Sequence, residues 1–253
     1  MTQTIAILNQ KGGVGKTTSA INLAAYLQKQ GKNVLLVDLD PQGNATSGLG
    51  ISKARQETTT YDLLINNTDL EGSTVEVNED LHLVPANANL AAAEVDLVSV
   101  QNRETKLKQV LTKASYDFVL IDCPPSLGLL SINALTAANW VLIPVQAEYY
   151  ALEGLSQLLD TVQRVRSGLN PSLELLGVVV TMFDGRTTLS ENVYGELKKH
   201  FGNKLFETVV PRNIRLAEAP SYGKSIADHD KWSKGARAYK QLAKEVSKRV
   251  GEG

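Results

Sequence analysis

A glycine-rich loop at residues 10–18, Gln-Lys-Gly-Gly-Val-Gly-Lys-Thr-Thr, directly follows the short apolar run at residues 5–8. A strand, then a glycine loop, then a helix is the order that a phosphate-binding loop requires. Glycines let backbone N–H groups turn inward around phosphate oxygens, and the N-terminus of the following helix adds unpaired donors and partial positive charge. A glycine turn with incidental lysines is the alternative, but the strand before the loop argues against it. The sequence therefore predicts a bound nucleoside triphosphate.

The last residues of this loop suit a triphosphate that carries magnesium. Lys16 can reach the β- and γ-phosphates, and the Thr17 hydroxyl can ligate Mg²⁺. The residues expected to hold the nucleotide within one subunit are Gly12, Gly13, Val14, Gly15, Lys16, Thr17 and Thr18.

The loop departs from the general pattern G-x-x-x-x-G-K-[ST], because Gln10 stands at its first glycine and an additional lysine, Lys11, precedes the glycine pair. A lysine at this point is expected to point away from the helix start, so it would not serve its own nucleotide. The loop resembles the deviant Walker A motif of the ParA/MinD group of ATPases. That resemblance implies a homodimer that sandwiches two ATP molecules, with Lys11 contacting the phosphates held by the partner subunit.

Acidic residues follow two of the predicted strands. Asp38 and Asp40 lie in a loop that Pro41 keeps non-helical, and Asp122 follows the apolar run 118–121. Ligands of parallel sheets bind beyond the carboxyl ends of the strands. Asp122 therefore fits the Walker B position near Mg²⁺, and Asp38 can hydrogen-bond a water on that ion. Each acid taken alone could equally be a simple turn or strand-end residue, and the glycine loop favours the functional interpretation.

Hydrolysis at such a site depends on positioning and charge neutralisation. The match to the family's Asp-x-Asp-Pro-Gln segment implies that Asp40 is the hydrolytic residue and that residues 38–47 sense the nucleotide. Lys16, Lys11 and Mg²⁺ would stabilise the γ-phosphoryl transition state. If the partner supplies Lys11, turnover must wait for dimerisation, which describes a switch rather than a fast catalyst.

Apolar runs alternate with amphipathic stretches, which predicts an α/β fold: a mostly parallel twisted sheet with helices on both faces, the architecture of a P-loop NTPase. The length and hydrophobic content suit one ATPase domain, residues 1–253. The expected strands are residues 4–8, 33–37, 81–85, 118–121, 140–145, 175–181 and 207–210. The expected helices are residues 17–30, 90–99, 105–114, 129–138, 152–167, 189–201 and 233–250. Residues 47–80 are polar, weakly periodic and the least predictable part of the chain.

Composition excludes several classes of protein. The chain has one cysteine, Cys123, which leaves no disulfide framework and no Cys-x-x-Cys metal site within one chain, and we expect it to be a small buried residue. No apolar run approaches the ~20 residues of a membrane span. The N-terminus runs straight into the first strand without a signal peptide, so a cytoplasmic location is expected.

Charge is unevenly distributed along the chain. Residues 186–253 contain 14 Lys and Arg against 8 Asp and Glu, whereas residues 1–185 contain 12 against 19. This asymmetry indicates an anionic partner for the C-terminal part. The cations expected to contact this partner, which the resemblance described below implies is DNA, are Arg186, Arg215, Lys224, Lys231, Lys234 and Arg237.

The C-terminal helix has two contrasting faces. Cations recur every three or four residues on one face, at Lys231, Lys234, Arg237, Lys240, Lys244 and Lys248. The opposite face is predicted to dock on the domain through Trp232, Ala236, Tyr239, Ala243, Val246 and Val250. A basic stripe is often only a solvated face. Arg186 and Arg215, however, match arginines that Soj-type relatives use to bind DNA without sequence preference.

The resemblance extends over nearly the whole chain, through segments 40–46, 146–154 and 211–221, and is strongest to the chromosomal ParA proteins often called Soj. It implies a nucleoid-associated ATPase that dimerises on ATP, binds double-stranded DNA non-specifically, and is released when a ParB-type protein stimulates hydrolysis. By position, Pro211 and Asn213 resemble residues that frame adenine in relatives, although an ordinary turn is the alternative. A MinD-like membrane-cycling ATPase of division-site placement and a small-molecule phosphotransferase remain alternatives. No stable membrane association is expected.

Overall fold

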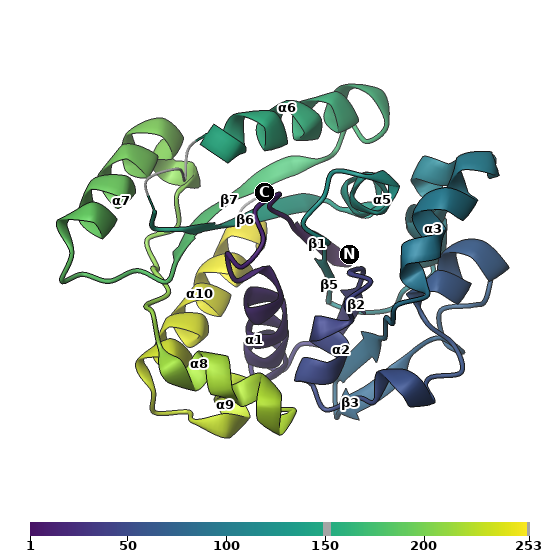
Figure 1. The fold of residues 1–253 in the computed structure, drawn as a ribbon, viewed down its shortest axis with the longest axis horizontal. Coiled ribbons are helices and arrows are strands. Elements are labelled where there is room, and N and C mark those ends of the chain that lie inside the picture. The colour runs from purple at the N-terminus through teal and green to yellow at the C-terminus, as the bar shows by residue number, and fades with distance from the viewer. Residues whose placement is uncertain (149–152, 252–253) are drawn as a thin grey trace.

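A seven-stranded sheet forms the centre of the computed structural model, which describes residues 1–148 and 153–251 (Figure 1). The strand order is β3-β4-β2-β5-β1-β6-β7, and neighbouring strands are parallel except β3 and β4. The strands are β1 (Gln3–Ile7), β2 (Val34–Asp38), β3 (Val75–Asn78), β4 (Leu81–Val84), β5 (Phe118–Asp122), β6 (Trp140–Gln146) and β7 (Glu174–Thr181). The carboxyl ends of the parallel strands therefore meet at one edge.

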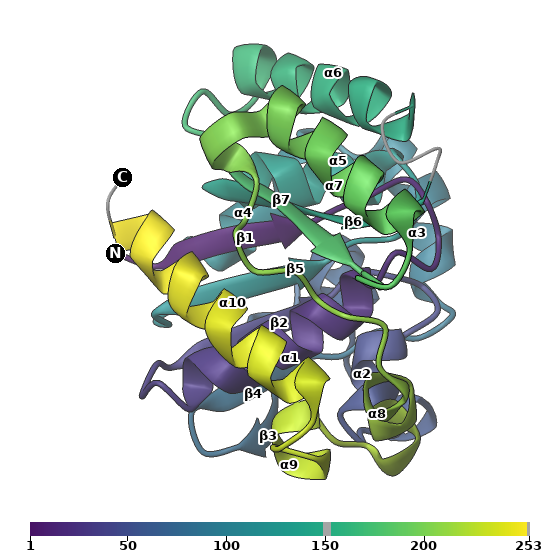
Figure 2. The ribbon, with the colours of Figure 1, turned by 90° about the vertical axis from the view of Figure 1, so that its left-hand side faces the viewer.

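Helices cover both faces of this sheet. They are α1 (Lys16–Gln28), α2 (Asn44–Gly48), α3 (Leu90–Asp96), α4 (Lys106–Leu111), α5 (Leu129–Ala137), α6 (Glu153–Gly168), α7 (Thr188–Phe201), α8 (Ile214–Glu218), α9 (Ile226–His229) and α10 (Lys234–Gly251). Short helical turns are η1 (Lys53–Arg55), η2 (Asp62–Asn66), η3 (Leu97–Ser99), η4 (Arg103–Thr105), η6 (Gly202–Lys204) and η7 (Ala219–Tyr222). Helices α1 and α10 pack together on one face, and α5, α6 and α7 lie on the other (Figures 1 and 2). None of the helices in the described ranges is long and apolar enough to cross a membrane.

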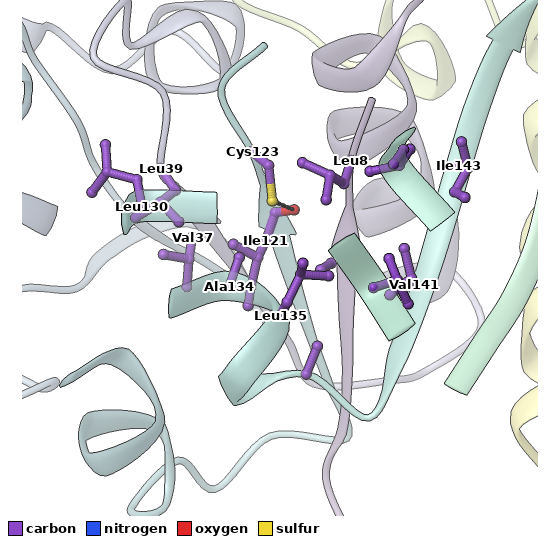
Figure 3. Close-up of a cluster of buried hydrophobic side chains, with 14 of the residues drawn as sticks. Leu8, Val37, Leu39, Ile121, Cys123, Leu130, Ala134, Leu135, Val141 and Ile143 are labelled. Atoms are coloured by element: carbon purple, nitrogen blue, oxygen red, sulfur yellow. Dashed lines mark hydrogen bonds between the residues drawn. The ribbon is translucent and has the colours of Figure 1, made fainter. Parts of the chain in front are cut away.

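The core follows from the two-residue period of the strands. Along β5, Val119 and Ile121 join the cluster under α5, whereas Phe118 and Leu120 join the cluster under α1 and α10. Cys123 continues the first cluster, where its Sγ donates to the Ile121 carbonyl (Figure 3). Cys123 is a small buried residue, as expected, and its burial raises the pKa of the thiol.

Six of the seven predicted strands are confirmed, and the prediction for residues 207–210 is wrong. The N–H groups of Glu207 and Thr208 donate to the Glu245 carboxylate of α10 rather than to a neighbouring strand, at 2.9 and 3.1 Å. The Val210 N–H donates to the Val180 carbonyl of β7 at 2.8 Å, and Leu205 and Pro211, on either side of the segment, form isolated bridges. In the unpredicted region 47–80 the structure contains the end of α2, the helical turns η1 and η2 and the edge strand β3.

The predicted docking face of α10 needs one correction. Ala236, Tyr239, Ala243, Val246 and Val250 are buried, as expected, but Trp232 is 79% exposed. Helix α10 begins at Lys234, so position 232 lies in the preceding turn and does not follow the helical period. Residues 149–152 lie outside the described residues. They include the first residue of the predicted helix 152–167 and part of the segment 146–154.

Candidate functional site

The glycine loop forms an open cradle between β1 and α1. Gly13 and Gly15 adopt φ angles of 75° and 87°, the left-handed region that side chains disfavour. A Cβ atom at Gly12 or Gly13 would meet no atom within 4 Å, so the space above the loop is free for phosphate oxygens. Helix α1 starts at Lys16 with no side-chain cap, which leaves its first N–H groups available to an anion.

Two side chains that the sequence analysis missed hold this loop. The Thr181 hydroxyl at the end of β7 donates to the Val14 carbonyl at 2.8 Å. Asn9 donates to the Pro144 carbonyl of β6 at 2.7 Å and accepts from the Lys11 N–H at 3.0 Å. The loop is therefore fastened to β6, the neighbour of β1, and to β7 beyond it. The sequence could have indicated Asn9, because it is a polar residue between the first strand and the loop. No local sequence pattern indicates Thr181.

Lys16 lies within the cradle and is only 7% exposed. Its Nζ donates to the Lys11 carbonyl at 3.2 Å, which uses one of three donors. Burial lowers the pKa of this ammonium, and the nearby Asp122 and Asp40 carboxylates oppose that shift. A bound phosphate would supply the anionic partner that the remaining donors lack within this pocket.

Asp122 supplies a buried carboxylate at the end of β5. Its Cα is in register with those of Asp38 and Ile7, so the acid lies beneath the glycine loop. It is fully buried. Among the residues that the structure describes, neither of its carboxylate oxygens has a conventional hydrogen-bond partner. Burial and then the Asp38 charge raise its pKa well above the ordinary range, and the Thr17 hydroxyl lowers it. An orphaned buried carboxylate beside a threonine hydroxyl fits Mg²⁺, which binds through one or two protein oxygens plus substrate phosphates.

A dedicated metal cage is not part of this arrangement. No group of three or more His, Cys, Asp or Glu side chains in the described ranges could hold a metal ion. Asp122 and Thr17 are the residues that would hold a Mg²⁺ ion bound with the triphosphate.

Asp38 is committed to the structure of its own loop. Its Oδ2 accepts from both the N–H and the hydroxyl of Thr46 on α2, at 2.8 and 2.7 Å, and its Oδ1 accepts from the Asp40 N–H at 3.2 Å. The Thr46 hydroxyl also accepts from the Ala86 N–H after β4. Burial raises the pKa of Asp38 to about 6. Asp38 thus ties α2 to β2 beside the proposed magnesium position.

Asp40 lies at the same edge of the sheet and is 7% exposed. Its Oδ1 accepts from the Gln42 N–H at 2.9 Å, which closes a tight turn around Pro41. Its other oxygen could accept a hydrogen bond from a water molecule.

The Lys11 side chain leaves its own loop. Its Nζ lies 2.9 Å from Glu148 Oε2 beyond the end of β6, and both side chains are 46% exposed. The other Glu148 oxygen accepts from Gln146 at 2.6 Å. Lys11 therefore pairs with a carboxylate at the rim of the site rather than reaching into the cradle.

Pro211 and Asn213 lie in an extended segment beside the end of β7. The Phe183 N–H donates to the Val210 carbonyl, and the Arg212 N–H donates back to Phe183, which places Pro211 next to the sheet. Asn213 Oδ1 is buried without a hydrogen-bond partner in the described ranges. An amide oxygen of this kind can accept from an exocyclic amine, which is what recognition of adenine requires.

The predicted DNA-contacting cations are all exposed but are not in one place. Arg186 precedes α7, where it forms a fork on Asp184 at 2.8 and 2.7 Å and holds the pKa of that carboxyl down to about 2. Arg215 on α8 bonds Glu218 at 2.9 Å. The remaining cations lie on the short elements that follow α8 and on the start of α10: Lys224, Lys231, Lys234 and Arg237.

Comparison with known proteins gives a clear result. Residues 2–175 match a family model described as an AAA domain. The chain is 56% identical to the sporulation initiation inhibitor protein Soj of Bacillus subtilis, over 98% of this chain and 99% of that protein. It is 58% identical to the chromosome-partitioning ATPase Soj of Thermus thermophilus, over 98% and 96%.

Solved structures share the fold at lower identity. A cobyrinic acid a,c-diamide synthase of Mycobacterium smegmatis with ADP and magnesium aligns with TM-score 0.89 at 37% identity, over 100% of this chain and 97% of that one. A plasmid partition protein of Borrelia burgdorferi aligns with TM-score 0.76 at 25% identity, over 99% and 98%.

Proposed function

Because this chain belongs to the family of chromosome-partitioning ATPases that includes Soj and ParA, we propose that it is an ATP-driven switch that binds and releases DNA during chromosome partitioning. The chain is an ATPase that uses Mg²⁺ and converts ATP to ADP and phosphate. Its identity to the Soj proteins, 56% and 58%, far exceeds its 37% identity to the diamide synthase, which favours partitioning over amide synthesis.

Each residue of the site has a role in this proposal. The N–H groups of residues 12–18 hold the phosphates, Lys16 contacts the β- and γ-phosphates, and Pro211 and Asn213 hold the base. Asp122 and Thr17 hold Mg²⁺, which neutralises charge on the phosphates when bound, and Asp38 hydrogen-bonds water around it. Asp40 orients the attacking water, whose oxygen bonds to the γ-phosphorus as the bond to the β-γ bridging oxygen breaks.

Dimerisation is the step that makes this site a switch. The observation that carries it is the position of Lys11, whose half-exposed ammonium lies outside its own cradle and pairs with Glu148 at the rim. A second subunit facing the same edge would bring its own phosphates to this ammonium. Lys11 would then stabilise the transition state in the partner's site, so hydrolysis requires two subunits.

DNA binding follows from pairing two basic surfaces. Doubling the number of neutralised phosphates raises affinity, because each contact releases condensed counterions. Each contact also steepens the log–log salt dependence by roughly 0.9. Stimulated hydrolysis by a ParB-type protein would separate the subunits and release the DNA. The MinD-like alternative needs an exposed apolar helix face. Helix α10 instead buries Ala236, Tyr239 and Val246.

The test is DNA retention by the double variant Arg186→Ala, Arg215→Ala. We expect it to lose DNA binding in Mg·ATP while forming ATP-dependent dimers normally. The control is the double variant Lys108→Ala, Lys113→Ala, which removes two positive charges from the acidic part of the chain, residues 1–185. It should bind DNA like the wild type. Binding is measured with ATP, with ADP and without nucleotide, across a range of salt. Wild-type affinity in the arginine variant would show that the surface is assigned wrongly.

A further inference from the structure

Two exposed aromatic side chains lie among the cations of the C-terminal part. Across residues 1–148 and 153–251, Tyr222 and Trp232 are the Phe, Tyr or Trp side chains exposed on the surface, at 65% and 79%. Ile214, at 71% exposed, lies near them in the chain at the start of α8. We call the following residues the aromatic–basic patch: Ile214, Arg215, Tyr222, Lys224, Lys231, Trp232 and Lys234.

Contacts between its elements make this patch one surface. The Tyr222 ring lies 4.9 Å from the His229 ring, and the Trp232 N–H donates to Asp230 Oδ1 at 3.2 Å. Arg215 Nε lies 3.6 Å from the other oxygen of Asp230. Lys231 Nζ lies 5.3 Å from the Trp232 ring centroid. Asp230 therefore holds both the Arg215 side chain and the backbone N–H of Trp232, and Figure 2 shows α8, α9 and the start of α10 gathered at one corner.

Phosphate contacts alone do not account for these aromatic groups. Lysine and arginine neutralise a duplex backbone without help from exposed rings, because duplex bases turn their faces toward each other. Unpaired bases, by contrast, offer faces on which aromatic side chains stack, and a basic surface with exposed rings is how proteins hold single strands. Lys231 lies over the Trp232 ring, Lys234 begins α10 two residues further on, and Arg215 lies on the adjoining helix α8.

We infer that the aromatic–basic patch binds single-stranded DNA, with bases stacked on Trp232 and Tyr222 and cations on the phosphates. This inference rests on the proposed DNA-binding function of the same surface and adds unpaired bases as a ligand class. An anionic membrane is the competing partner for rings among cations. It is disfavoured because the three apolar side chains come from separate short elements that charged residues separate, rather than from one continuous apolar helix face.

The test uses the full-length protein in Mg·ATP and a 20-nucleotide oligothymidylate. Trp232→Ala and Tyr222→Ala should each weaken its binding about 5- to 150-fold, the range expected for removing one stacking side chain. Duplex affinity and the salt slope for the oligonucleotide should stay unchanged. Lys234→Ala should instead lower that slope by about 0.7. Trp232→Phe should restore binding, and Val98→Ala, which trims an exposed apolar side chain on η3, is the matched control.

Fluorescence provides a second measurement. The chain has two tryptophans, and Trp140 is partly buried with its Nε1 bonded to Gln3. Stacking on Trp232 should quench emission on titration with the oligonucleotide, and Trp140→Phe should keep that quenching.

Several outcomes would overturn the inference. Wild-type oligonucleotide affinity in Trp232→Ala would do so, as would an equal loss on duplex and single strand. Binding to phosphatidylserine vesicles that depends on Trp232, with unchanged oligonucleotide binding, would assign the patch to membranes. A change in self-association alone would assign it to contacts between copies. Wild-type protein that binds duplex but not the oligonucleotide removes this inference alone, whereas protein that binds neither also removes the proposed function.

Discussion

The ammonium of Lys11 lies 2.9 Å from the carboxylate of Glu148, although 137 residues separate them in the chain. The pair joins the glycine loop after β1 to the segment after β6. Because both side chains are about half exposed, the pair contributes at most about 1 kcal/mol. Such a contact can hold the lysine in a single subunit and still be exchanged for a phosphate of the partner.

Glu148→Gln should favour the ATP-dependent dimer, because Lys11 no longer has to leave a carboxylate. The dimer should form at a protein concentration about two- to fivefold lower, as expected for an exposed ion pair. Light scattering in Mg·ATP, on an Asp40→Ala background that blocks hydrolysis, measures this. Glu196→Gln, which breaks an exposed pair with Lys199 on α7, is the control. Weaker dimers in Glu148→Gln would mean that the carboxylate instead presents Lys11 to the partner.

Thr181→Val should weaken ATP binding without unfolding the protein. The change keeps the shape of the side chain but removes the hydroxyl that bonds the buried Val14 carbonyl. Losing one such bond costs about 0.5–1.5 kcal/mol, so the Kd for ATP should rise about two- to tenfold. Calorimetric titration measures the Kd, and Thr181→Ser should stay near wild type. Equal affinity in all three proteins would show that this anchor does not shape the loop.

Asp38 should make the nucleotide-free protein less stable as pH rises from 4 to 6. Burial raises its pKa from the ordinary value of 3.8 to about 6, so the folded state binds a proton in this range that the unfolded state has released. The stabilising contribution of Asp38 is therefore greatest below its pKa in the unfolded state. It is lost as pH rises through its pKa in the folded state. Denaturant unfolding should show that the wild type loses about 2 kcal/mol more of its free energy of unfolding than Asp38→Asn between pH 4 and 6. Parallel pH profiles for the two proteins would refute the assignment.

Gly223→Ala should destabilise the fold by about 1–3 kcal/mol, because alanine disfavours its φ of 62°. A Cβ there would also lie 2.6 Å from the Gly50 Cα, where η7 meets the chain after α2. Gly195→Ala is a control with the opposite expected sign. Gly195 lies within α7 with no atom near its Cβ position, so alanine there should raise the free energy of unfolding by about 1 kcal/mol. Denaturant midpoints compare the two. A neutral Gly223→Ala would mean that the two turns separate easily.

Much of the sheet could be predicted from the sequence, and the failures have local causes. Strands β1, β2, β5 and β6 are continuous apolar runs between helical segments, so their period and length identify them. The edge strand β3 was not predicted, because its residues alternate between half-exposed and exposed in a polar region. As an edge strand it pairs with β4 alone among the described strands. Residues 207–210 are apolar enough for a strand, yet Glu245 takes two of their N–H groups.

The sequence by itself determined the features that depend on neighbouring residues: the glycine loop, the acids that follow apolar strands, and the two faces of the last helix. The tertiary structure alone decided which distant groups meet, such as Thr181 with Val14 and Lys11 with Glu148. Local conformation follows from steric and hydrogen-bond preferences within a few residues. Contacts across more than a hundred residues depend instead on the order in which strands join the sheet, and short-range preferences do not encode that order.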